Sequence, residues 1–130
     1  MYLLDTHVLI CFLCNDPVLP VKTTELIGKS RDAAIFVSIA SFWEMAIKSS
    51  KDKLTLPCSI TDLMSLCADT LHLSILVIKD VHLETLRILP WIHKDPFDRL
   101  MISQAISEDL ALITADEQID RYPVRRVWVI

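Results

Sequence analysis

Acidic residues in apolar surroundings are the feature of this sequence that most clearly indicates chemistry. Asp5 lies between Leu4 and the apolar run of residues 8–13, and Glu44 stands among aromatic and aliphatic residues in the segment 39–47. Carboxylates in such places lose hydration at a substantial cost, so they are normally paired with a cation or bound to a metal ion. The sequence offers Asp5 no obvious cationic partner.

Two further aspartates fall where helices are expected to begin. Asp98 lies in the first turn of a helix begun by Asp95, and Asp116 follows a short apolar run. Together with Asp5 and Glu44 they would supply carboxylate oxygens, which are ligands that Mg²⁺ prefers. A Mg²⁺ ion held by carboxylates can activate a water molecule, orient a phosphodiester and neutralise the charge that develops during hydrolysis.

Three of the four acids also have a purely structural interpretation. Asp116 could cap the short helix that follows it, and Asp95 could cap a helix whose first turn contains Asp98, where a negative charge complements the helix dipole. Glu44 and Lys48 have the i,i+4 spacing of a surface ion pair, which is worth about 0.3 kcal/mol. For one acid alone these interpretations are favoured, whereas a shared location of all four favours a metal site.

The elements that must position these residues alternate along the chain. Short runs rich in Val, Ile and Leu predict strands at residues 2–4, 34–38, 73–78, 111–114 and 126–130. Amphipathic segments predict helices at residues 6–13, 21–31, 39–50, 60–71, 81–89 and 96–109, and a short one at 117–121. Strands that alternate with helices form a parallel sheet with helices on its faces. Ligand sites of such sheets form at the carboxyl ends of the strands, so the four acids are expected to converge there.

Composition limits the class of protein. A chain of 130 residues with 52% hydrophobic and 23% charged residues fits one domain with its own core. Gly28 is its only glycine, which excludes a P-loop or a glycine-rich dinucleotide site. The net charge of −4 argues against indiscriminate binding to nucleic acid, although acids at a metal site would account for part of it. No membrane span or signal peptide is recognisable, so a cytoplasmic location is expected.

Cysteine spacing raises a separate possibility. Cys11 and Cys14 could form half of a zinc site or a redox pair, but Cys58 and Cys67 supply no second closely spaced pair. The cysteines are therefore expected to be buried free thiols, in keeping with a reducing compartment.

Other side chains are candidates near the site. His93 could orient a carboxylate or touch phosphate, but a loop histidine bonded to backbone is favoured. Lys48 and Arg99 are equally expected to pair with the acids or to contact phosphate.

The large apolar side chains near these acids divide into two groups. Phe42, Trp43 and Met45 have helical spacing and are expected in the core rather than as a surface for base stacking. Trp91, beside Pro90 in a predicted loop, is the better candidate for stacking or for a partner surface.

Four motifs in the chain match one family. They are Leu3-Leu4-Asp5-Thr6-His7, Ser38-x-x-Ser41-x-Trp43-Glu44, His93-x-Asp95-Pro96-Phe97-Asp98-Arg99 and Leu112-Ile113-Thr114-Ala115-Asp116, of which the third is the most specific. Over essentially its whole length the chain resembles the PIN-domain ribonucleases, and among them the VapC toxins of bacterial type II toxin–antitoxin pairs. The resemblance implies a three-layer α/β/α PIN-like fold with a central, mostly parallel five-stranded sheet, and a single domain over residues 1–130.

The resemblance also implies a function and a set of site residues. It implies a magnesium-dependent endoribonuclease, with Mn²⁺ able to substitute, that cuts tRNA or rRNA and is neutralised by a small VapB-like antitoxin. The family's catalytic positions fall on Asp5, Glu44, Asp98 and Asp116, with Asp5, Asp98 and Asp116 as metal ligands and Glu44 reaching the metal through water. Supporting positions fall on Thr6 and Ser38, with Asp95 and Arg99 as further candidates.

Two other functions stay open on the residues alone. The chain could be a non-catalytic interaction module with the same fold, or a metal-dependent DNA nuclease. Apolar helices near both ends of the fold also make a homodimer an expected assembly.

Overall fold

The computed structural model describes residues 1–31 and 34–130, and its centre is a five-stranded sheet. The strands are β1 (Tyr2–Leu4), β2 (Ile35–Ser38), β3 (Ser74–Leu76), β4 (Ala111–Ile113) and β5 (Arg126–Val127). Their order across the sheet is β3-β2-β1-β4-β5, and each pair of neighbours is parallel. The expectation of a mostly parallel five-stranded sheet is confirmed, and β1 is its central strand.

Several strands are shorter than the apolar pattern predicts. The strand expected at 73–78 pairs only over Ser74–Leu76, and Val77 and Ile78 beyond it are exposed. The strand expected at 126–130 ends at Val127, and those expected at 34–38 and 111–114 each lose one residue. A strand extends only as far as a neighbouring strand can form hydrogen bonds with it. An apolar run in the sequence does not reveal where that neighbour ends.

Helices connect the strands. They are α1 (Thr6–Leu13), α2 (Val21–Gly28), α3 (Ile39–Ser50), α4 (Ile60–Ser65), α5 (Asp80–Ile88) and α6 (Pro96–Ser107). A π-helical turn, η1 (Leu66–Thr70), continues α4, and a 3₁₀-helix, η2 (Glu117–Arg121), follows β4.

The bounds of α1, α3 and η2 agree with the predicted helices, and the other helices differ at their ends. The helix expected at 21–31 ends at Gly28, a residue with low helix propensity. The helix expected at 60–71 widens into η1 after Ser65. Those expected at 81–89 and 96–109 are shifted or shortened by one or two residues.

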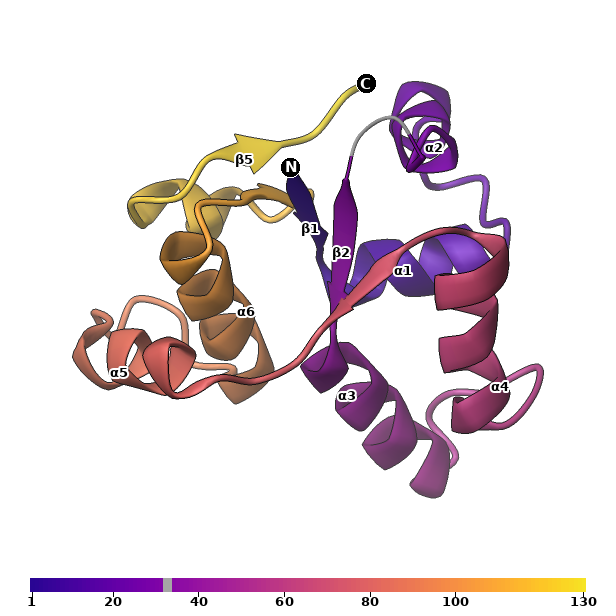
Figure 1. Ribbon diagram of the computed structural model, residues 1–130, viewed down its shortest axis with the longest axis horizontal. Coiled ribbons are helices and arrows are strands. Elements are labelled where there is room, and N and C mark those ends of the chain that lie inside the picture. The colour runs from indigo at the N-terminus through magenta and orange to yellow at the C-terminus, as the bar shows by residue number, and fades with distance from the viewer. Residues whose placement is uncertain (32–33) are drawn as a thin grey trace.

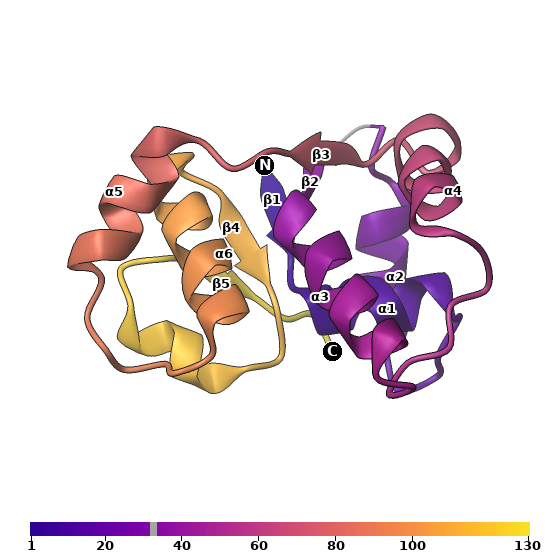
Figure 2. The ribbon, with the colours of Figure 1, turned by 90° about the horizontal axis from the view of Figure 1, so that it is seen from below.

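Helices cover both faces of the sheet and complete a three-layer α/β/α arrangement, as predicted. Helices α1, α2 and α4 lie on one side and α5 and α6 on the other, while α3 continues from the end of β2 (Figure 1 and Figure 2). Alternate residues of β1 serve two apolar cores, because Leu4 packs in the cluster of Leu9 and Phe42 and Leu3 in that of Met101. Within residues 1–31 and 34–130, no helix combines the length and apolar character that a membrane span requires.

Candidate active site

Helix N-termini fix several candidate side chains at the carboxyl edge of the sheet. Asp5 caps α1, Ser38 caps α3 and Asp116 caps η2; in each case a side-chain oxygen accepts the backbone N–H two residues further on, at 3.4, 3.1 and 3.0 Å. Asp95 caps α6 by accepting the N–H groups two and three residues ahead, at 2.9 and 3.0 Å. The capping interpretation of Asp95 and Asp116 is therefore correct, and it also places them where a shared site can form.

Asp5 occupies the centre of this edge, directly after β1. Its Oδ2 accepts a hydrogen bond of 2.7 Å from the Thr114 hydroxyl, at the end of the neighbouring strand β4. Burial raises the pKa of the Asp5 carboxyl, and the hydrogen bond from Thr114 opposes that rise. The same Thr114 oxygen accepts the backbone N–H of Asp116 at 3.1 Å. Thr114 therefore links two of the candidate ligands, a role that its position two residues before Asp116 could have suggested.

Asp98 is exposed to the negative electrostatic field of neighbouring acids. Burial, followed by the negative charges of Asp5 and Asp95, raises the pKa of Asp98 to about 7, and Glu44 adds to this rise. His93 acts in the opposite direction. The cluster thus concentrates negative charge that the chain itself does not fully neutralise.

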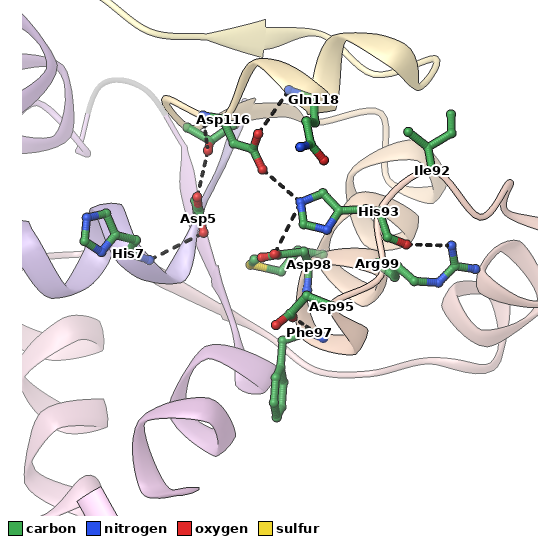
Figure 3. Close-up of polar contacts among 12 residues, drawn as sticks. Asp5, His7, Ile92, His93, Asp95, Phe97, Asp98, Arg99, Asp116 and Gln118 are labelled. Atoms are coloured by element: carbon green, nitrogen blue, oxygen red, sulfur yellow. Dashed lines mark hydrogen bonds and ion pairs between the residues drawn. The ribbon is translucent and has the colours of Figure 1, made fainter. Parts of the chain in front are cut away.

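His93 joins two of the acids through its ring. Its Nε2 is 2.8 Å from Oδ2 of Asp116 and 3.4 Å from Oδ2 of Asp98, so the imidazole lies between the two carboxylates (Figure 3). The favoured interpretation of His93 as a loop histidine bonded to backbone is wrong, and the carboxylate-orienting alternative describes it. The signal available in the sequence was its place two residues before the Asp95 cap.

Glu44 lies at the edge of this cluster on α3. Lys48 Nζ is 2.8 Å from Glu44 Oε2, which is the i,i+4 pair that the spacing predicts. The Glu44 charge nevertheless acts on both Asp5 and Asp98. Glu44 therefore belongs to the acidic cluster while its own charge is balanced by Lys48.

Thr6 and Ser38 contact other helices rather than the carboxylates. The Thr6 hydroxyl is 2.8 Å from that of Ser41 on α3, and the Ser38 hydroxyl donates to Gln104 Oε1 of α6 at 2.6 Å. All four side chains are buried. These contacts tie together α1, α3 and α6, the helices that carry Asp5, Glu44 and Asp98.

Arg99 does not pair with the acids, contrary to one of the two expectations for it. Its side chain is only 3% exposed, and its guanidinium donates to the backbone carbonyls of Leu89, Pro90 and His93 at 2.9–3.4 Å. Buried as it is, it is not available to contact phosphate either. Arg99 supports the site by holding the loop that carries His93.

The prediction that Trp43 lies in the core is wrong. Phe42 and Met45 are buried as predicted, but Trp43 is 56% exposed. Its ring meets that of Phe97 edge to face, with centroids 4.9 Å apart. The pair connects the second turn of α3, near Glu44, with the first turn of α6, near Asp98.

The cysteines are only partly as expected. Cys11 and Cys67 are buried, and burial raises the pKa of Cys67 to about 11. Cys14 and Cys58 are exposed, so the prediction of buried thiols is wrong for them. Cys14 follows the last residue of α1 at the end of the apolar run, where the helix leaves the core.

A cavity of about 200 Å³ opens beside the acids. Asp5, Thr114 and Asp116 line one part of it, and apolar side chains that include Leu19 and Trp128 line the rest. Space for a small group of a substrate is therefore present next to two of the candidate ligands.

The donor set suits a hard divalent cation. Asp5, Asp98 and Asp116 offer only carboxylate oxygens. The pKa of Asp98 is raised first by burial and then by the negative charge of neighbouring acids, and a bound cation would offset both effects. In the part of the chain that the structure describes, no group of three or more His, Cys, Asp or Glu side chains is already arranged as ligands. Binding an ion therefore requires side-chain movement, including at the contacts that His93 makes.

Comparison with known proteins supports the fold and the family. The PIN domain family model matches residues 2–125. The structure of VapBC2 from Rickettsia felis, bound to a DNA fragment from their promoter, is similar with a TM-score of 0.73 and 18% identity, covering 98% of each chain. FitAB bound to an IR36 DNA fragment gives a TM-score of 0.59 and 14% identity over 98% of this chain and 94% of that one. No curated protein sequence matches the chain significantly.

Proposed function

This chain belongs to the PIN-domain family, and on that basis we propose that it is a magnesium-dependent endoribonuclease with Asp5, Glu44, Asp98 and Asp116 as its catalytic acids. The observation that carries the proposal is the electrostatic influence of Asp5 and Glu44 on Asp98, together with the His93 ring that joins Asp98 to Asp116. Burial and then the charges of neighbouring acids, Asp5 and Glu44 among them, raise the pKa of Asp98 to about 7. A cluster of this kind without a full set of cationic partners is suited to binding a divalent metal ion.

The residues have distinct roles in this proposal. Asp5, Asp98 and Asp116 would hold Mg²⁺, or Mn²⁺ in its place, and Glu44 would support the bound ion from α3. Thr114 fixes the Asp5 carboxylate, and His93 fixes the other two ligands until the ion is bound. When bound, the ion supplies Lewis-acid activation of a water molecule and neutralises charge on the phosphodiester.

The proposal extends to biological partners. The likeness to VapBC2, which is described bound to a DNA fragment from their promoter, supports a VapC-type toxin that a small VapB-like antitoxin neutralises. We further propose tRNA or rRNA as the substrate and a homodimer as the assembly. Growth inhibition on expression, relieved by co-expression of an adjacent antitoxin gene, tests the first part, and sedimentation tests the second.

Cleavage assays test the enzymatic proposal. Total RNA and matched single-stranded DNA are incubated with the purified full chain in Mg²⁺ or in EDTA. RNA cleavage is expected only with Mg²⁺, and Asp98→Asn and Asp5→Asn should abolish it. The exposed Asp69→Asn serves as the matched control and should cut like the parent.

The other outcomes separate the competing functions. Cleavage of DNA but not RNA would assign a DNA nuclease. No cleavage and no heat of Mg²⁺ binding by calorimetry would assign a non-catalytic interaction module. An active Asp5→Asn variant would contradict the proposed site.

A further inference from the structure

Trp91 is a large aromatic side chain that is open to solvent in the loop that also carries His93. It is 79% exposed and lies in the loop between α5 and α6. The guanidinium carbon of Arg99 is 3.7 Å from the centroid of its ring, which is cation–π geometry. With the cation against one face and most of the side chain in solvent, the other face of the indole is free to stack.

The Trp91 ring rests on a rigid support. Arg99 is buried, and its guanidinium is held by the backbone carbonyls of Leu89 and Pro90 at 3.1 and 2.9 Å. The hydroxyl of Tyr122 secures the same loop, because it donates to the Pro90 carbonyl and accepts the N–H groups of the two residues after Trp91. A ring that is already oriented loses little entropy when a ligand stacks on it.

The surroundings of Trp91 are basic. A groove of about 420 Å³ is lined by Leu86, Arg87, Trp91, Lys94, Pro96 and Arg99. Three of these residues are cations and none is acidic, although the chain carries a net charge of −4. Arg87 is paired with Glu84 at 2.9 Å, but both side chains are about 70% exposed, so phosphate can replace the carboxylate at small cost. Lys94 forms no ion pair with any residue in the described ranges.

The groove and the acidic cluster are joined by the loop between α5 and α6, which carries both Trp91 and His93. Arg99 follows Asp98 on α6, and its Nη1 lies 3.4 Å from the carbonyl of His93. The His93 ring in turn contacts Asp98 and Asp116, as Figure 3 shows. A strand whose base stacks on Trp91 would thus contact the same loop that positions His93 against two of the catalytic acids.

We propose that Trp91 is a base-stacking platform for single-stranded RNA, with Lys94 and Arg87 contacting the adjacent phosphates. The inference rests on the proposed function and specifies its substrate: an unpaired segment next to the bond that is cut. Aromatic side chains that stack bases, combined with cations that follow the backbone, are the usual means of binding single strands without strong sequence preference.

Binding without cleavage tests the platform. A labelled short oligoribonucleotide of mixed sequence is titrated into the full-length Asp98→Asn protein, and its anisotropy is measured. Trp91→Ala should weaken binding by about 5- to 150-fold, the range for loss of one base–aromatic stack. Trp91→Phe should recover most of the affinity, whereas Trp91→Leu, which keeps apolar bulk without a π face, should not. Lys94→Ala should reduce the slope of log affinity against log salt by about 0.7.

A second readout monitors the ring directly. In a Trp43→Phe, Trp128→Phe background, Trp91 is the only tryptophan, and its fluorescence should be quenched by the oligoribonucleotide. Thermal unfolding of each variant separates loss of stacking from loss of the loop. Trp91→Ala with parental stability and parental RNA affinity would overturn the proposal. So would dissociation of a dimer on Trp91→Ala with RNA affinity unchanged, because the surface would then belong to a second copy of the chain.

The two proposals can fail separately. Metal-dependent RNA cleavage together with RNA binding that does not depend on Trp91 would contradict the stacking role of Trp91 and leave the nuclease proposal standing. RNA binding that depends on Trp91, by a parent chain that cuts no nucleic acid, would support the stacking role of Trp91 and contradict the nuclease proposal.

Discussion

Replacing Asp98 by Asn should make the metal-free protein more stable at pH 8, although it removes a candidate catalytic group. Burial and the charges of Asp5 and Asp95 raise the pKa of Asp98 from 3.8 to about 7 in the folded chain. In the unfolded chain the carboxyl ionises near its ordinary value, so between these two pKa values the unfolded state has released its proton and the folded state has not. The free energy of unfolding must therefore fall as the pH rises from about 4 to about 7.

The size of the effect follows from the same interval. Each pH unit between the two pKa values costs about 1.4 kcal/mol, which gives about 4 kcal/mol for the whole interval. The side chain of Asp98 is 29% exposed, so solvent screens part of this cost. Asn has the same shape without the charge, and Asp98→Asn should therefore raise the stability at pH 8 by an amount on the order of 2–4 kcal/mol.

Urea unfolding at a series of pH values, in EDTA, measures this difference. The parent and Asp98→Asn should be nearly equal at pH 4 and should diverge toward pH 8. Asp69→Asn, an exposed acid, should follow the parent throughout. Mg²⁺ should then stabilise the parent and have a much smaller effect on Asp98→Asn. Equal stabilities of the parent and Asp98→Asn at pH 8 would refute the reasoning, because the acidic cluster would then carry no electrostatic strain.

Three further outcomes are expected. Thr114→Val removes the hydroxyl that donates to Asp5 and should cost about 1.5–3 kcal/mol by urea unfolding at pH 8, whereas Thr114→Ser keeps the donor and should lose only about 0.8 kcal/mol for the missing methyl group. Arg99→Met leaves buried loop carbonyls without a donor and should cost about 2–4 kcal/mol, measured in the same way. Cys14 and Cys58 should react with a thiol reagent in the native protein while the other two cysteines react only after unfolding; four fast-reacting thiols would contradict the burial pattern.

The architecture was predictable because its signals are local. A short apolar run followed by an amphipathic segment occurs repeatedly, and only a parallel sheet with helices on its faces buries both. Asp5 and Asp116 could be placed at the carboxyl edge for the same reason, since Asp5 directly follows β1 and Asp116 lies three residues after the end of β4. The ends of the strands were less predictable: Val77 and Ile78 are as apolar as the residues before them, but no neighbouring strand extends that far.

Side-chain directions within the site could not be predicted from local patterns. Arg99 was expected equally to pair with the acids or to contact phosphate, but it binds backbone carbonyls whose positions are set by the path of a loop. His93 was misjudged because its partner Asp116 is 23 residues away. Trp43 is apolar and helical, yet it is 56% exposed, and its ring meets that of Phe97 edge to face.

The central position of β1 has a consequence for the protein during its synthesis. Of the five strands of the sheet, β1 is made first, but the Thr114 hydroxyl that fixes Asp5 lies 109 positions further on, and Asp116 lies just beyond it. The nascent chain therefore carries Asp5 and Glu44 for most of its translation without the residues that complete their site. If the chain cuts RNA as proposed, its activity begins only after β4 has been made and inserted beside β1. The order of translation then keeps an incomplete chain from cutting the RNAs of the ribosome that is making it.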